Sequence, residues 1–462
     1  MLLQSIEIAN YRGFGSSQEV EFADPANGSG LTVLVGPNNS GKSTVLKTIR
    51  HLVSDDDVFV AGSDDRRAQA LKITLKGKND KDFEIGVSGR GSAARLKKEG
   101  KWAFGIGNDI IYVPARRPWN DRFHAHQFGE DHKKQHETGF YNNLRQQEFY
   151  VDAAFGASMA LIEITASSKR EFTQLLTKFE PTIEDWTIDN RDQDFISYKS
   201  VSGASHRIGL VGDGVSNIFR LAYALYDFKR GSILLLDEPE LSLHPQAQRR
   251  LYEELRKLAK TGQIVISTHS PHFVSWQDIQ SGAKVYRANL VKHDGTQLTT
   301  LSRETIRDIG KVADEKKNRK LYDVVAREVF FSRGTLFVEG QEDAHIIANY
   351  VQENTLPDIE IFGYGAGGAS LIGGWLRLAR QLGIRAAAIF DGDPEGVLAF
   401  KKCSLEFLDD EQVWLRKLPT PDIRDKLDNG VEGIFDERWQ IKEQYMAEWN
   451  ALLSECEAFL RS

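Results

Sequence analysis

Several features that are common in other protein classes are scarce or absent in this 462-residue sequence. It has only two cysteines, Cys403 and Cys456, too few for a disulfide framework and without the paired spacing of a structural zinc site. No 18 apolar residues run together, so we expect no membrane-spanning segment. The N-terminal residues lack the basic start, apolar run and cleavage site of a secretion signal. We therefore expect a cytoplasmic location and no membrane partner.

An excess of positive charge is also absent. The 59 lysines and arginines are outnumbered by 66 acidic residues, for a formal net charge of −7. No global positive field attracts nucleic acid, so any DNA contact must use a local patch. Between Ala115 and His136, five basic residues accompany three acidic ones, which makes this segment either a DNA-facing patch or an ordinary solvated surface.

The hydrophobic patterns that are present predict an α/β protein with two domains. Apolar runs that read as strands alternate with helical periodicity from residue 202 to 270, and a second alternation begins at Thr335. A charged stretch of low apolar content, residues 303–330, separates them. We therefore expect a first domain over residues 1–330, with an inserted and partly helical segment at about 115–200. A second domain is expected over residues 331–462, ending in helices.

A glycine-rich phosphate-binding loop is predicted near the N-terminus. Residues 36–43, GPNNSGKS, match the pattern GxxxxGK[ST], with an apolar strand before them and a helix after them. Backbone amides at the start of that helix face phosphates, the lysine supplies a positive charge, and the Ser43 hydroxyl coordinates Mg²⁺. The residues expected to bind ATP here are Asn38, Asn39, Ser40, Gly41, Lys42, Ser43 and Thr44.

Two further carboxylates follow an apolar run at residues 233–236. Because a buried parallel strand delivers the residues after it to one edge of a sheet, Asp237 and Glu238 are expected beside the phosphate-binding loop. Asp237 would then hold Mg²⁺ or Mn²⁺, and Glu238 would orient the attacking water.

The order of these motifs resembles that of ABC-type ATPases. ILLLDEPELSLHP followed by STHSP is similar to their Walker B, D-loop and switch-histidine series, which implies that His269 senses the γ-phosphate. IEIANYRGFG resembles the first strand of the chromosome-maintenance and recombination members, which implies that Arg12 approaches the nucleotide. The family's LSGGQ signature is replaced by GDGVS at residues 212–216. By resemblance, Gly214 and Ser216 would contact ATP of a second copy, and the ATPase heads would form a homodimer or a higher oligomer.

A second group of carboxylates is expected in the C-terminal domain. Glu339 and the pair Asp391 and Asp393 close two apolar strands, and Asp343 lies at a helix start. Carboxylates gathered at one sheet edge repel one another unless cations balance them, and oxygen-rich acidic sites suit Mg²⁺ or Mn²⁺. The sequence therefore predicts a metal site formed by these four residues.

Residues 334–394 resemble the TOPRIM fold of topoisomerases, primases and certain nucleases, through FVEGQED, GYGAGG and IFDGD in that order. An ABC-type ATPase followed by TOPRIM is similar to the overcoming-lysogenisation-defect (OLD) nuclease family. That resemblance implies one or two divalent ions at the acidic cluster, cleavage of DNA and a role in defence against phage. It also implies that Lys417 stabilises phosphate charge. Arg424 stands where the family often has an acid, which leaves Asp422, Asp425 and Glu432 as substitutes.

The sequence thus predicts an ATP-hydrolysing, metal-dependent DNA endonuclease, with Glu238, His269, Glu339, Asp391, Asp393 and Lys417 as catalytic residues. A partner defence protein or RNA is a further expected interaction. One alternative is a DNA-binding or sensor ATPase that is a scaffold for a separate effector and has a degenerate TOPRIM site. A nucleotidyl transferase is a third, less favoured because no topoisomerase tyrosine domain or primase module is evident.

Overall fold

The computed structural model describes most of the chain outside the segment expected to face DNA. The described residues are 2–53, 58–60, 71–78, 84–89, 93–99, 110–115, 155, 158–189, 195–229, 231–307, 327–356, 358–363, 365–426, 428 and 430–461. Residues 116–136 of the expected patch lie outside them. The chain forms two compact units, one of residues 1–274 and 281–298, the other of 275–280 and 299–462. Among the described residues, no helix has both the length and the apolar character needed to cross a membrane.

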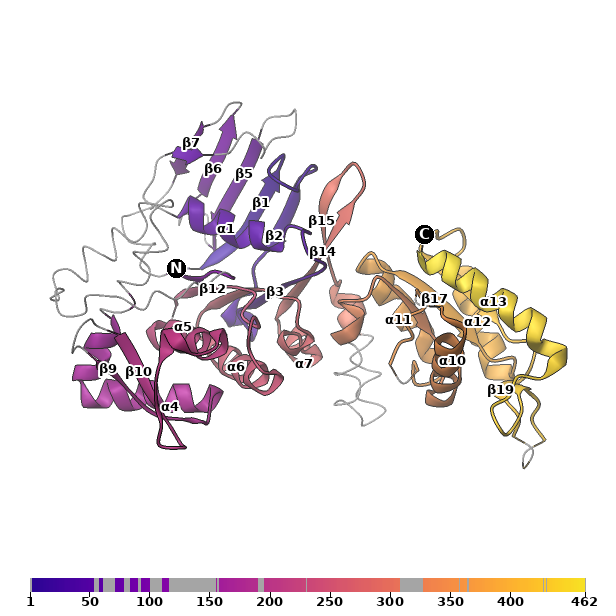
Figure 1. The fold of residues 1–462 in the computed structure, drawn as a ribbon. Helices are drawn as coiled ribbons and strands as arrows, with labels where there is room; N and C mark the ends of the chain where they lie inside the picture. Colours follow the sequence, from indigo (N-terminus) through magenta and orange to yellow (C-terminus); the bar gives the residue numbers. More distant parts are fainter. Residues whose placement is uncertain are drawn as a thin grey trace. The chain divides into compact units, whose positions relative to one another are not determined.

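A mixed six-stranded sheet forms the centre of the first unit (Figure 1). Its order is β15 (Gly295–Thr300), β14 (Lys284–Val291), β3 (Leu31–Val35), β13 (Gln263–Ser267), β12 (Ile233–Asp237) and β8 (Ile110–Val113). From β14 to β8, each strand pairs in parallel with the next one in this order. Every residue of β3, β12 and β13 is buried, as expected for strands covered on both faces. The carboxyl ends of these three strands therefore share one edge of the sheet.

A second, antiparallel sheet covers the helix that follows the phosphate-binding loop. Its order is β2 (Gln18–Glu21), β1 (Leu3–Ala9), β5 (Leu71–Gly77), β6 (Glu84–Gly89), β7 (Ala93–Glu99) and β4 (Val58–Val60). Helix α1 (Lys42–Leu52) packs its apolar side between the two sheets, where Val45 and Ile49 share a core with Ile6 and Ile73. This packing fixes the start of α1 relative to the strand ends.

Further helices complete the first unit. Helices α5 (Asp213–Asp227) and α6 (Pro245–Leu258) lie on the side of the central sheet away from α1 (Figure 1). Helix α4 (Ala166–Phe179) packs with a small sheet of β9 (Ile183–Asp189), β10 (Phe195–Ser200) and β11 (Ser205–Arg207). Phe172 and Trp186 meet edge to face there, with ring centroids 5.5 Å apart.

The second unit is a parallel sheet with helices on both faces. Strands β16 (Gly334–Phe337), β17 (Arg385–Phe390) and β18 (Val413–Lys417) pair in that order. Helices α10 (Gln341–Asn354) and α13 (Glu443–Arg461) share one core with the sheet, in which Ile347, Ile389 and Trp449 are buried. Helices α11 (Ala369–Gln381) and α12 (Pro394–Glu406) pack against the other face, where Phe390 meets Phe400. A short pair, β19 (Asp422–Arg424) and β20 (Gly433–Phe435), follows β18.

One apolar run of the second unit pairs with its neighbour over a shorter length than its sequence pattern indicates. The run IEIFGYG, beginning at Ile359, pairs with β16 only through one bridge, between Ile361 and Leu336. Leu336 donates its N–H to Glu360 and accepts from Phe362. The left-handed backbone of Gly363 and Gly365 then interrupts the extended conformation, so no longer ladder forms. After this turn, Ala366 donates its N–H to the carbonyl of Val338.

Candidate functional sites

The phosphate-binding loop has the geometry expected of a nucleotide site. Gly41 begins α1 with φ of 95°, a left-handed conformation that suits glycine, and a Cβ there would lie 2.7 Å from Oγ1 of Thr296. Lys42 is buried, and its Nζ donates to the carbonyls of Gly36 (3.0 Å) and Pro37 (2.8 Å). Burial lowers the pKa of Lys42 to about 8, although nearby carboxylates, Glu238 first, oppose the shift.

Strand pairing brings the first predicted carboxylate onto this loop. Asp237 ends β12 opposite Ser267 of β13, and its Oδ1 accepts from the hydroxyls of Ser43 (2.7 Å) and Ser267 (2.6 Å). A loop serine and a strand-end aspartate in contact form the donor set that Mg²⁺ takes beside nucleotide phosphates. The buried hydroxyl of Ser40 has no hydrogen-bond partner among the described residues. The loop therefore fits ATP with Mg²⁺ or Mn²⁺, which Ser43 and Asp237 would hold.

The predicted γ-phosphate sensor lies next to the predicted water-orienting residue. Nε2 of His269 is 3.6 Å from Oε1 of Glu238, and burial, with the charge of Lys42, lowers the pKa of His269. Glu240 accepts the backbone N–H of His269 at 2.6 Å and so fixes the turn after β13. Sequence reasoning missed Glu240, because only the fold shows that it reaches this turn. Lys42, Glu238 and His269 thus share one site.

Arg12 lies in a turn next to the start of α1, whereas the residues of the divergent signature lie on another helix of the first unit. Arg12 is exposed in a turn whose Phe14 and Gly13 approach Gly41 and Thr296, so the turn adjoins the start of α1. Gly214 and Ser216 begin α5 instead. A Cβ on Gly214 would lie 2.7 Å from the carbonyl oxygen of Ser242, so the start of α5 packs on the segment after Glu238. No described contact joins Gly214 or Ser216 to the phosphate-binding loop.

In the second unit, three aspartates form a tight cluster at the carboxyl edge of the sheet. Asp391 follows β17, Asp343 lies in the first turn of α10, and Asp422 begins β19. One carboxylate oxygen of each lies within 4.8 Å of the others. Three converging carboxylates, one of them 8% exposed, are the oxygen ligands that Mg²⁺ and Mn²⁺ prefer. The donor set thus fits a divalent ion.

The electrostatics of this cluster also favour a cation. Burial raises the pKa of Asp391 and of Asp343, and the neighbouring carboxylates add to both shifts. Burial likewise raises the pKa of Glu339 to about 7. Oε1 of Glu339 accepts the backbone N–H of Asp391 at 2.9 Å, so this side chain holds the end of β17. A bound divalent ion would offset the repulsion between the ionised carboxylates.

The remaining predicted residues border the cluster. Asp393 is the N-cap of α12, and its Oδ1 accepts from the N–H of Gly396 at 2.6 Å. Its negative charge contributes to the raised pKa of both Glu339 and Asp391. Lys417 ends β18 opposite Phe390, next to Asp391, and its Nζ donates to the carbonyl of Leu418 at 2.9 Å. The structure thus gathers Asp343, Asp391 and Asp422, with Glu339 and Asp393 beside them. No described contact joins the side chain of Lys417 to the cluster.

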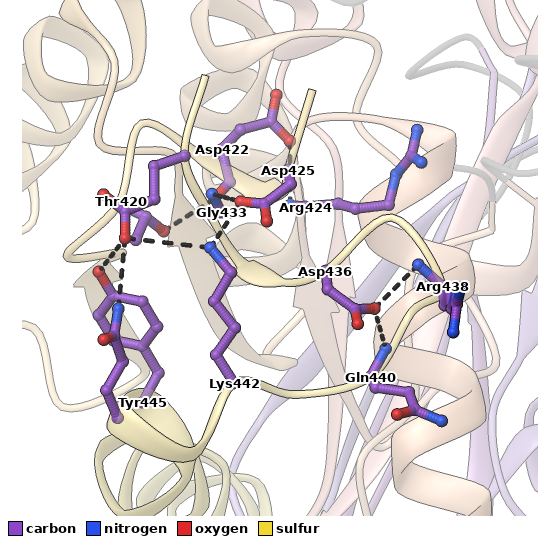
Figure 2. Close-up of polar contacts among 12 residues, drawn as sticks. Thr420, Asp422, Arg424, Asp425, Gly433, Asp436, Arg438, Gln440, Lys442 and Tyr445 are labelled. Atoms are coloured by element: carbon purple, nitrogen blue, oxygen red, sulfur yellow. Dashed lines mark hydrogen bonds and ion pairs between the residues drawn. The ribbon is translucent and has the colours of Figure 1, made fainter. Parts of the chain in front are cut away.

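The structure separates the three residues that the sequence offered as substitute ligands. Asp422 lies in the cluster, whereas Asp425 accepts from Lys442 (2.6 Å) and from the N–H of Gly433 (2.8 Å). Figure 2 shows Lys442 reaching Asp425. Glu432 accepts from the hydroxyl of Tyr445 at 3.0 Å. Asp425 and Glu432 therefore belong to a structural network beside β19 and β20.

Two basic residues that follow Asp422 neutralise part of the acidic surroundings. Lys426 forms ion pairs with Asp422 and with Glu342 of α10. Arg424, the departure noted in the sequence, pairs with the same Glu342 at 2.5 Å. Sequence reasoning missed Glu342 and Lys426, since only the fold brings them together beside Asp422. The ion pairs of Arg424 and Lys426 with Glu342 join β19 to α10 and so hold Asp422 beside Asp343.

Comparison with known proteins identifies the two units. The model of the "AAA ATPase domain" matches residues 1–151, and that of "AAA domain, putative AbiEii toxin, Type IV TA system" matches 134–275. "Overcoming lysogenization defect protein-like, TOPRIM domain" matches residues 330–393. The chain is similar to curated OLD nucleases, and its second unit matches the OLD-like TOPRIM model. The predicted α/β fold, a P-loop ATPase region followed by TOPRIM, is therefore confirmed.

Curated OLD-type relatives align with most of the chain. The OLD nuclease of Thermus scotoductus is 25% identical over an alignment of 386 residues that covers 68% of this chain and 68% of that protein. Endonuclease GajA of Bacillus cereus is 24% identical over an alignment of 341 residues. The alignment covers 69% of this chain and 54% of GajA, so this chain spans about half the length of GajA. Among solved structures, the alignment with an Smc head bound to the C-winged helix domain of ScpA covers 67% of this chain and 100% of that chain. The sequence identity is 14% and the TM-score is 0.43.

Proposed function

We propose that this protein is an ATP-hydrolysing, divalent-metal-dependent DNA endonuclease that acts in defence against phage. The observation that carries the proposal is the cluster of Asp343, Asp391 and Asp422 in a TOPRIM unit, on a chain that also has a complete phosphate-binding loop. Its relatives are named nucleases, which supports DNA cleavage as the activity of this unit. The protein's resemblance to the OLD family supports the defence role.

Each residue of the cluster has a defined part in the proposed reaction. Asp343, Asp391 and Asp422 would hold a divalent ion, and Glu339 and Asp393 border a place for a second. Mg²⁺ or Mn²⁺, when bound, supplies positive charge and Lewis acidity to a phosphodiester. Glu339 fixes the end of β17 through the N–H of Asp391, and Lys417, at the end of the neighbouring strand β18, would add a positive charge for the phosphate. The protein thereby aligns a scissile phosphate at the carboxyl edge of the sheet.

The ATPase unit supplies a separate, nucleotide-dependent activity. Lys42 binds the outer phosphates, Ser43 and Asp237 hold the magnesium ion of ATP, and Glu238 orients the attacking water. We also propose that ATP joins two copies through these units, with the start of α5, at Gly214 and Ser216, completing the site of the second copy. A partner defence protein or RNA would then respond to the assembled form.

A comparison of two neighbouring aspartates tests the assignment of the metal ligands. We expect Asp422→Asn to lower DNA cutting by more than about tenfold and to reduce the rise in melting temperature caused by Mn²⁺, because one ligand charge is lost. Asp425→Asn is the matched control, since asparagine retains the oxygen that accepts from Lys442 and Gly433. We expect the control to cut within about twofold of wild type. Equal cutting and equal Mn²⁺ response in the two variants would contradict the assignment.

A substitution at the water-orienting residue tests the proposed dimer. Glu238→Gln should bind ATP but hydrolyse it at least about a hundredfold more slowly, because an amide orients water poorly and accepts no proton. Slow turnover should accumulate an ATP-bound dimer, which sedimentation velocity with Mg²⁺ and ATP would detect. Glu253→Gln, an exposed change on α6, is the control. A Glu238→Gln protein that stays monomeric at saturating ATP would contradict dimerisation through the ATPase units.

A further inference from the structure

Trp439 is an exposed aromatic side chain that belongs to none of the predicted motifs. It lies in the turn of residues 436–440, directly after β20, with 41% of its surface exposed. We propose that Trp439 stacks on an unpaired base of the DNA strand that the carboxylate cluster binds. The inference rests on the proposed nuclease function and adds to it a DNA-contacting residue outside the metal site.

The turn that carries Trp439 is closed by several hydrogen bonds. Oδ1 of Asp436 accepts from the N–H of Arg438 (2.8 Å) and of Gln440 (2.9 Å), as Figure 2 shows. The backbone of Asp436 also donates to the carbonyl of Gln440 at 2.9 Å and accepts from the N–H of Trp439 at 3.0 Å. These bonds hold Trp439 at φ of 65°, a left-handed conformation that bulky residues rarely adopt. The indole is therefore displayed from a turn of fixed shape.

A second aromatic ring fixes the orientation of the indole. His345 of α10 meets Trp439 edge to face, with ring centroids 4.7 Å apart and planes at 77°. This single ring contact leaves Trp439 substantially exposed, and His345 is itself exposed. A pre-oriented aromatic ring with accessible surface suits stacking, because little side-chain entropy remains to be lost on binding.

The contacts of α10 connect this ring to the carboxylate cluster. Residues 342 and 345 are neighbours on one helix face, about 4.5 Å apart along the axis. Glu342 pairs with Lys426, which in turn pairs with Asp422 of the cluster. Trp439 therefore lies only a few side chains from the position where a scissile phosphate is expected.

The contacts that lead from Trp439 to the carboxylate cluster, together with the exposed Arg438 next to it, favour a nucleic acid over a protein partner. Glu437 and Arg438 are both exposed just before it in the turn. Arg424 and Lys426, which pair with Glu342, lie along the contacts that lead to the cluster. Single-stranded nucleic acids are bound by this combination, in which aromatic rings stack on bases while basic side chains contact phosphates. Arg438 would accordingly contact the phosphate next to the stacked base.

The test measures binding of a fluorescent single-stranded DNA in the Asp391→Asn background, by anisotropy with Mn²⁺ and a series of salt concentrations. Trp439→Gly removes the ring but suits the left-handed turn, and Trp439→Phe keeps an aromatic face. We expect Trp439→Gly to weaken binding by about fivefold or more, without changing the salt dependence, because no charge is lost. Trp439→Phe should retain most of the affinity. Leu405→Ala, 78% exposed near the end of α12, is the control and should not alter binding.

Unchanged affinity of Trp439→Gly in a background that binds DNA would overturn the stacking proposal and leave the nuclease proposal intact. An equal loss in Trp439→Gly and Trp439→Phe would also overturn it, since a structural role would then explain both. Absence of any DNA binding by the background protein and by wild type, together with absence of cutting by wild type, would overturn the nuclease proposal and this inference with it. A protein partner would be indicated if Trp439→Gly impaired only an assembly with another chain.

Discussion

Replacing Asp391 with asparagine is expected to lower DNA cutting by more than about a hundredfold while ATP hydrolysis continues at the wild-type rate. Asp391 shares its cluster with Asp343 and Asp422, and asparagine removes the charge that a divalent ion requires. The ATPase residues belong to the other compact unit, so their contacts are unchanged. The measurement is conversion of supercoiled plasmid to nicked or linear DNA with Mg²⁺ or Mn²⁺, alongside phosphate release from ATP.

The same substitution provides a check on folding. Asparagine fills nearly the same volume as aspartate and removes a buried carboxylate whose pKa is raised, so we expect the variant to unfold at no lower temperature than wild type without metal. A loss of cutting that accompanied unfolding would therefore be recognised. Wild-type cutting by pure, folded Asp391→Asn would show that the nuclease site lies elsewhere.

Replacing Lys42 with alanine is expected to reduce ATP hydrolysis by more than about a hundredfold. The lysine is the only cation that the phosphate-binding motif itself contributes, and its buried Nζ already lies among the loop carbonyls of Gly36 and Pro37. Without it, the outer phosphates lose their interaction with a positive charge. That interaction strengthens as negative charge develops on the phosphates in the transition state. Phosphate release at saturating ATP measures the effect.

Lys47→Ala is the matched control for this prediction, because Lys47 is exposed on the same helix, α1. We expect the control to retain hydrolysis within about twofold of wild type. Melting temperatures of both variants should be compared, since removal of Lys42 takes a positive charge away from the nearby Glu238, Asp237 and Glu240. Full activity of a folded Lys42→Ala protein would refute the assignment of residues 36–43 as the nucleotide site.

Local patterns were sufficient to predict the ATPase motif and the buried strands beside it. The loop at Gly41 and Lys42 needs specific residues at consecutive positions, and the buried strands of the parallel sheets read as continuous apolar runs. Their carboxyl ends must then meet at one edge, which is why Asp237 was expected beside Ser43. The structure places the two in contact.

Tertiary placement of short, irregular segments could not be predicted in the same way. Asp422, Asp425 and Glu432 were equivalent in the sequence, and only the fold separates them. Asp422 joins Asp343 and Asp391, whereas Asp425 is held by Lys442. Trp439 gave no signal either, because a turn held by Asp436 has no hydrophobic period. The apolar residues after Ile359 indicate a strand, but their pattern does not show that Gly363 and Gly365 adopt a left-handed backbone. Only one bridge to β16 therefore forms.

The most direct measurement of the central claim is plasmid cutting by wild-type protein as free divalent metal is varied. The protein is first treated with EDTA and freed of it, and Mn²⁺ is then added back without ATP and with ATP, free metal being held constant. We predict no cutting in EDTA and cutting that rises with Mn²⁺ to saturation. Cutting that persists in EDTA, or its absence at every metal concentration with and without ATP, would contradict the assignment of Asp343, Asp391 and Asp422 as a nuclease metal site.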